Sequence, residues 1–82
     1  MQVSILSLRE VIWQGLVKDL ILPTEDGEMC VLDFHQPFLA RLTKGEIRFG
    51  VLSRQATPTP RIFVKDGLVH MYGNELTILV EA

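Results

Sequence analysis

Alternation of polar and apolar residues is the dominant pattern along this chain. It is clearest at residues 46–51, and shorter stretches of it occur at residues 2–5 and 61–65. A period of two places successive side chains on opposite faces of a strand, so these segments predict half-buried β-strands. Other runs are continuously apolar: residues 20–22, 68–69 and 78–80. Such runs are typical of strands covered on both faces, or covered on one face by a partner.

Turn-forming residues separate these runs at short intervals. Asp26-Gly27, Lys44-Gly45, Asp66-Gly67 and Gly73-Asn74 all supply residues that tolerate positive φ. Asp66-Gly67 and Gly73-Asn74 each lie between two strand-like runs, so each predicts a two-residue hairpin turn. Pro58 and Pro60 remove ladder donors, and we expect a loop around them.

No segment carries sustained helical periodicity. Residues 6–21 contain Gly15 and several β-branched residues, which argues against a helix there. Residues 38–42 fit either a short helix or a strand. Many short strands separated by turns are typical of an all-β sandwich or barrel, and residues 1–82 are enough for a single domain.

Charge narrows the range of partners. The net charge is −2, which disfavours nucleic acid because that partner requires clustered positive charge. The acidic residues concentrate at Glu25, Asp26 and Glu28. That cluster fits a solvated turn or a binding surface equally well. The first residues lack the basic flank of a secretory signal, and no apolar run is long enough to span a bilayer. We therefore expect no direct membrane insertion.

Signatures of catalysis and metal binding are sparse. There is no phosphate-binding glycine loop and no nucleophile elbow, so we expect neither an enzyme nor a nucleotide site. Cys30 and His35 are close in sequence, but one cysteine and two histidines are too few for a structural zinc site. We expect no metal and no cofactor. Cys30 is predicted to be a small core residue, and Trp13 is also predicted to lie in the core.

Short motifs in a fixed order resemble the ε subunit of F-type ATP synthases. Trp13 precedes Gly15 by two residues, as an aromatic precedes glycine in that family. Gly27-Glu28-Met29 is similar to the family's Gly-Glu-Leu turn. Residues 35–39, His-Gln-Pro-Phe-Leu, are similar to its His-Ala-Pro-Leu-Leu element.

The second half of the chain continues this resemblance. Thr43-Lys44-Gly45 leads into an alternating strand, where the family has Lys-Pro-Gly. Asp66-Gly67, Gly73-Asn74 and the Leu-Thr-Ile-Leu of residues 76–79 follow in the family's order. Each motif is weak alone, but their order and spacing cover nearly the whole chain.

The resemblance implies a two-sheet β-sandwich of short, mostly antiparallel strands. It also implies a non-catalytic central-stalk subunit that links the γ subunit to the membrane rotor ring and supports coupling of ion flow to ATP synthesis or hydrolysis. Such a subunit is peripheral, on the cytoplasmic face of the energy-transducing membrane. The alternative is a free-standing small β-sandwich module that binds other proteins.

Several positions inherit roles from the resemblance. Glu28 matches a glutamate that faces the rotor-ring loops, whose basic residues suit a carboxylate. Glu25 and Asp26 would add to the same field. His35 lies in the matched element and is expected to contact γ or the ring, or to hold its own loop. Phe38 and Leu39 are expected in the core.

Some features depart from the family pattern. Cys30 stands where the family has glycine, and Asp33-Phe34 stand where it has Pro-Gly, so we expect a different turn before His35. The family domain is followed by a pair of helices that inhibits ATP hydrolysis in many members. This sequence ends at Ala82, so neither that inhibition nor ATP binding is expected of it.

Overall fold

Strands make up the described part of the chain. The computed structural model describes residues 1–50 and 61–81, and no helix occurs among them. The residues 38–42 that sequence left undecided form a strand, and the loop expected around Pro58 and Pro60 lies outside the described residues. The strands are β1 Gln2–Leu6, β2 Val11–Leu16, β3 Asp19–Thr24, β4 Gly27–Leu32, β5 Phe38–Leu42, β6 Gly45–Phe49, β7 Ile62–Val64, β8 Asp66–Tyr72 and β9 Glu75–Glu81.

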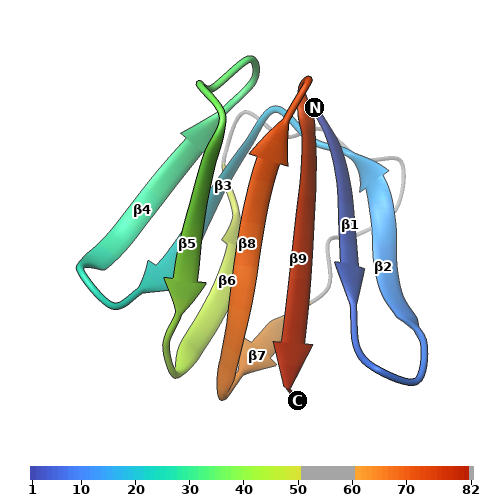
Figure 1. Ribbon diagram of the computed structural model, residues 1–82, viewed down its shortest axis with the longest axis vertical. Helices are drawn as coiled ribbons and strands as arrows, with labels where there is room; N and C mark the ends of the chain where they lie inside the picture. The colour runs from blue at the N-terminus through green and yellow to red at the C-terminus, as the bar shows by residue number, and fades with distance from the viewer. Residues whose placement is uncertain (51–60, 82) are drawn as a thin grey trace.

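The strands form two layers that curl around one core (Figure 1). One layer has the order β2-β1-β9-β8-β5 and the other β4-β3-β6-β7. The layers meet where the end of β3 pairs with the end of β5, at Thr24 and Leu42. Only the pairing of β1 with β9 is parallel among these strands, and every other pairing is antiparallel. The predicted two-sheet, mostly antiparallel β-sandwich is confirmed.

Alternate residues of each strand build the core between the layers. Val69 and Met71 of β8 are fully buried, while His70 between these two residues is exposed. Ile78 of β9 is also fully buried. The same period recurs in the second layer, where Leu20 and Leu22 of β3 are buried. Burying apolar side chains is the main stabilisation of such a fold, at about 25 cal/mol per Å².

Two turns have the backbone that their residues predict. Gly73 and Asn74 join β8 to β9 with φ of 58° and 59°, the two positive values that a type I′ hairpin needs. Gly27 follows the β3–β4 turn with φ of 110°. The hairpin predicted at Asp66-Gly67 is wrong: these residues begin β8, which pairs with β5 and β9 while β7 pairs with β6. The chain passes from one layer to the other here.

Trp13 packs at the edge of the core. The ring is half-buried against the core and makes an edge contact with Phe49, with ring centroids 4.7 Å apart. A Cβ on Gly15 would lie 2.7 Å from the Trp13 ring, so glycine leaves room for the indole two residues away on the same face. The Trp13–Gly15 spacing therefore has a packing cause.

Candidate partner-binding surfaces

The acidic turn, residues 25–28, is organised by Thr24. The Thr24 hydroxyl donates to the Gly27 carbonyl at 2.6 Å and accepts from the Asp26 N–H at 3.3 Å. The Glu25 N–H donates to the Arg41 carbonyl at 3.3 Å, which fixes the turn to the end of β5. Glu25, Asp26 and Glu28 are all exposed. The structure thus brings together the three carboxylates that sequence analysis selected.

Two arginines lie beside this turn. Arg48 of β6 forms an ion pair with Glu28 of β4, because both strands flank β3. Arg41 of β5 interacts electrostatically with Glu25. Exposed ion pairs contribute only about 0–1 kcal/mol, so Glu28 can exchange Arg48 for another cation at little cost.

His35 is bonded within its own loop. Its Nδ1 lies 2.9 Å from the Gln36 carbonyl oxygen, and its ring makes an edge contact with Phe38 at 5.0 Å between centroids. Its N–H donates to the Leu32 carbonyl at 3.1 Å. His35 therefore holds the loop between β4 and β5, and its contact with a partner stays a prediction.

Two core assignments made from sequence are wrong. Cys30 is exposed, because it shares the outward face of β4 with Glu28 while Met29 and Val31 face inward. Leu39 is 70% exposed because β5 turns Phe38 and Leu42 inward and Leu39 outward. The expectation for Phe38 is confirmed, since it packs against the core.

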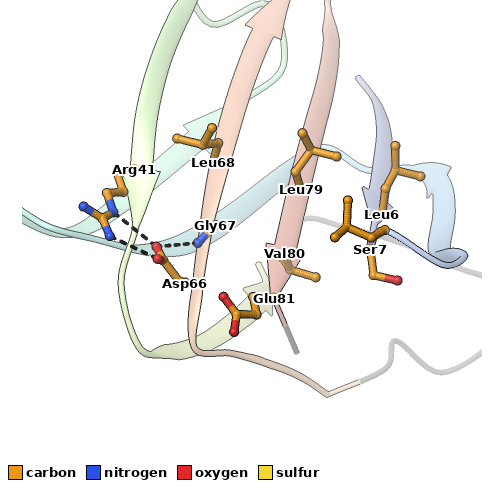
Figure 2. A pocket seen from close by; sticks show the side chains of 10 residues that line it. Leu6, Ser7, Arg41, Asp66, Gly67, Leu68, Leu79, Val80 and Glu81 are labelled. Carbon is orange, nitrogen blue, oxygen red and sulfur yellow. Dashed lines mark hydrogen bonds and ion pairs between the residues drawn. The ribbon is translucent and has the colours of Figure 1, made fainter.

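Leu39 belongs to an exposed apolar surface that sequence reasoning had not located. We call it the leucine face, and it is the outward side of the layer that contains β5, β8, β9, β1 and β2. The strand register places Leu68, Leu79 and Leu6 opposite one another on neighbouring strands, and Figure 2 shows them side by side. Leu68 and Leu79 are each 49% exposed. The continuously apolar runs at residues 68–69 and 78–80 were the signal, because they leave one apolar residue on each face.

A hollow of about 490 Å³ opens on this face. Its apolar part includes Leu6, Leu68 and Leu79, and an ion pair borders it (Figure 2). Arg41 donates from Nε at 3.2 Å and from Nη2 at 3.0 Å to the two carboxylate oxygens of Asp66. The Arg41 hydrogen bond, helped by the Gly67 N–H, holds the pKa of Asp66 below its ordinary value, and Asp66 raises the pKa of Arg41.

No group of three or more His, Cys, Asp or Glu side chains in residues 1–50 and 61–81 is arranged to hold a metal ion. The described residues also contain no helix of the length and apolarity needed to cross a membrane.

Comparison with known proteins identifies the family. The family model for the β-sandwich domain of the ATP synthase delta/epsilon chain matches residues 1–82. The chain belongs to this family. The chloroplastic ATP synthase epsilon chain of Chlamydomonas reinhardtii is 36% identical over 81 residues, which cover 96% of this chain and 57% of that protein. The ATP synthase epsilon chain of Nitrosococcus oceani is 32% identical, with coverage of 99% and 56%. The chain thus spans a little over half the length of these relatives.

Solved structures share the fold of this delta/epsilon domain. A chain from the central stalk/c-ring structure of the Tetrahymena thermophila mitochondrial ATP synthase aligns with a TM-score of 0.76 and 17% identity, over 99% of this chain and 63% of that one. A chain from the Euglena gracilis mitochondrial ATP synthase aligns with a TM-score of 0.76 and 21% identity, over 95% and 48%. At these identities the alignments show the fold alone.

Proposed function

We propose that this chain is a non-catalytic central-stalk subunit of an F-type ATP synthase. It links the γ subunit to the membrane rotor ring and supports coupling of ion flow to ATP synthesis or hydrolysis. The observation that carries the proposal is the family match over all 82 residues. Relatives named ATP synthase epsilon chain support it further, and one of them is 36% identical.

Two surfaces of different chemistry suit two different partners. The acidic turn offers exposed carboxylates to basic loops of the ring, through charge-assisted hydrogen bonds. The leucine face offers apolar area to γ, because contiguous exposed apolar surface marks protein–protein contact. The loop between β4 and β5, which contains His35, lies at the opposite end of β4 from the acidic turn (Figure 1). A subunit with both surfaces can connect γ to the ring without any chemistry of its own.

This role gives the chain its position in the cell. Binding to the rotor ring holds the subunit at the cytoplasmic face of the energy-transducing membrane as a peripheral component, with no insertion of its own. The acidic turn would face the ring, and γ would cover the leucine face.

The acidic turn provides the test. Glu28→Gln removes the carboxylate, and Arg48→Gln removes its intramolecular partner while leaving that carboxylate in place. Both changes break the same ion pair. We expect Glu28→Gln to weaken association with rotor-ring subunits of the same organism about tenfold, or about 1.4 kcal/mol. Arg48→Gln should preserve or strengthen it. Both effects are measured as the affinity of the full chain for the rotor-ring subunits, in the presence of γ.

Three results would count against this proposal. Equal weakening by both substitutions would mean that the ion pair, not the free carboxylate, matters, and a large fall in Tm for Glu28→Gln would make that residue structural. Absence of binding by the unaltered chain to γ and to the ring at micromolar concentration would favour the free-standing protein-binding module instead.

A further inference from the structure

The loop before His35 contains a turn with an unusual central residue. The His35 N–H donates to the Leu32 carbonyl at 3.1 Å and closes a turn with Asp33 and Phe34 at its centre. Phe34 has φ of 61°, whereas Asp33 has a negative φ. A positive φ at this position is typical of the type II turn, whose third residue is normally glycine or asparagine because other side chains crowd the backbone at positive φ.

Burial of the ring does little to stabilise this backbone conformation of Phe34. The Phe34 side chain is 80% exposed, so the burial that normally stabilises an aromatic residue is missing. Leu32, two residues before it, is 51% exposed. A left-handed backbone at a bulky exposed residue is the kind of local strain that points to a function, when the surrounding structure holds it in place.

The surrounding structure does hold it in place. The Phe34 N–H donates to Asn74 Oδ1 at 2.7 Å, which joins this loop to the β8–β9 turn. The Asp33 N–H donates to the Lys18 carbonyl at 2.9 Å, and the Asp33 carboxylate pairs with the amino group of Met1. Figure 1 shows this loop, the β8–β9 turn and the start of β1 at the same end of the sandwich. A turn whose backbone is already fixed loses little backbone entropy on binding.

The chemistry around Phe34 selects the kind of partner. Residues 32–39 contain no Lys or Arg, the neighbouring amino group of Met1 is paired with Asp33, and Lys18 bonds to the loop through its backbone carbonyl. The loop therefore lacks the cluster of Lys and Arg with which peripheral proteins bind anionic lipid. It also differs from the acidic turn at the other end of β4, since six residues of a strand span roughly 17 Å. An uncharged aromatic side chain suits an apolar recess in a folded protein better than it suits polar, basic loops.

We propose that Phe34 is an anchor residue: its ring inserts into an apolar recess on the stalk partner that covers the leucine face. The proposal rests on the proposed function and adds a specific contact to it. The ring is already exposed on the domain, and the backbone bonds to Asn74 and Lys18 fix the turn that carries it before the partner arrives. In that partner we expect a recess of the size of one phenyl ring.

Two substitutions at Phe34 separate binding from folding. Phe34→Gly removes the ring and relieves the left-handed strain, so Tm should rise by a few degrees. Phe34→Ala removes the ring but keeps a Cβ at positive φ, so Tm should not rise. Both should weaken association with γ of the same organism by about tenfold or more, as loss of an anchor residue does. Phe63→Ala removes another exposed aromatic ring, on β7, and should leave association unchanged.

The measurement is titration of γ with the full chain, together with thermal unfolding of each variant. Unaltered affinity for both Phe34 variants, with normal binding by the unsubstituted chain, would overturn the anchor alone. No binding by the unsubstituted chain would overturn the proposed function. A fall in Tm for Phe34→Gly would make the ring structural. Phe34-dependent self-association, or binding to anionic vesicles without an effect on γ, would also overturn the anchor.

Discussion

A single packing contact explains the aromatic-x-glycine motif at residues 13–15. The Trp13 ring lies where a Cβ of residue 15 would be, and its edge meets Phe49 of the other layer. The sequence showed the spacing but not its cause, because the contact depends on β2 presenting both residues on one face. Trp13 is half-buried, so the expectation of a core residue is met only at the edge of the core.

Gly15→Ala tests this contact. The new methyl would displace the indole, and such overpacking costs about 1–3 kcal/mol. We expect the free energy of unfolding to fall by this order and the near-ultraviolet circular dichroism of the single tryptophan to change. Gln14→Ala, whose side chain bonds only to the exposed Ser4 hydroxyl among the described contacts, should stay within about 0.5 kcal/mol of the unaltered protein. Unchanged stability and spectrum in Gly15→Ala would contradict the account.

Elements were predictable where one face of a strand is polar and unpredictable where both are apolar. Alternation at residues 46–51 and 61–65 located β6 and β7, and Gly73-Asn74 located the β8–β9 hairpin. In β5, both Phe38 and Leu39 are apolar, so composition could not tell which faces inward. The Asp66-Gly67 error has a different cause: a local turn signal does not say whether the next strand pairs with the previous one.

The candidate site was predictable to the same extent. The acidic turn follows from local sequence, and its three carboxylates lie where expected. The Glu28–Arg48 pair could not be predicted from local sequence. It depends on β3, which lies between β4 and β6 and brings together two residues that are twenty positions apart. The backbone of Phe34 was equally hidden, since a bulky residue at positive φ runs against local preference.

The Arg41–Asp66 pair links β5 to β8 and should make stability depend on pH. Because the pKa of Asp66 is held below its ordinary value in the folded protein, the pair stabilises fully above the unfolded pKa. That stabilisation is lost as pH falls through the folded pKa. Asp66→Asn and Arg41→Gln should each flatten the acid side of the curve of unfolding free energy against pH, measured by urea titration.

Combining the two substitutions gives the control. If both act through one pair, the double variant should flatten the curve no further than either single variant. An acid side as steep in Asp66→Asn as in the unaltered protein would show that the pair does not control it.

At the scale of the whole molecule, the sandwich places two candidate contacts far apart: the acidic turn and the Phe34 loop lie at opposite ends of β4 (Figure 1). The leucine face is the outward side of the other layer. A rigid two-layer core holds these surfaces at fixed positions, which is what a connecting subunit in a rotating stalk requires. The central claim is that both surfaces are occupied at once in the assembled complex.

Cys30 allows the most direct measurement of that claim. It is the only cysteine in the chain, it is exposed, and it lies on the outward face of β4 between Glu28 and Leu32. A thiol-linked photo-crosslinker at Cys30, in the ATP synthase of the same organism with partner cysteines blocked, samples neighbours of both ends of β4. The Cys30→Ser chain controls for attachment elsewhere. The account predicts adducts with both a rotor-ring subunit and γ. A chain that assembles but forms adducts with only one of them, or with neither, would contradict it.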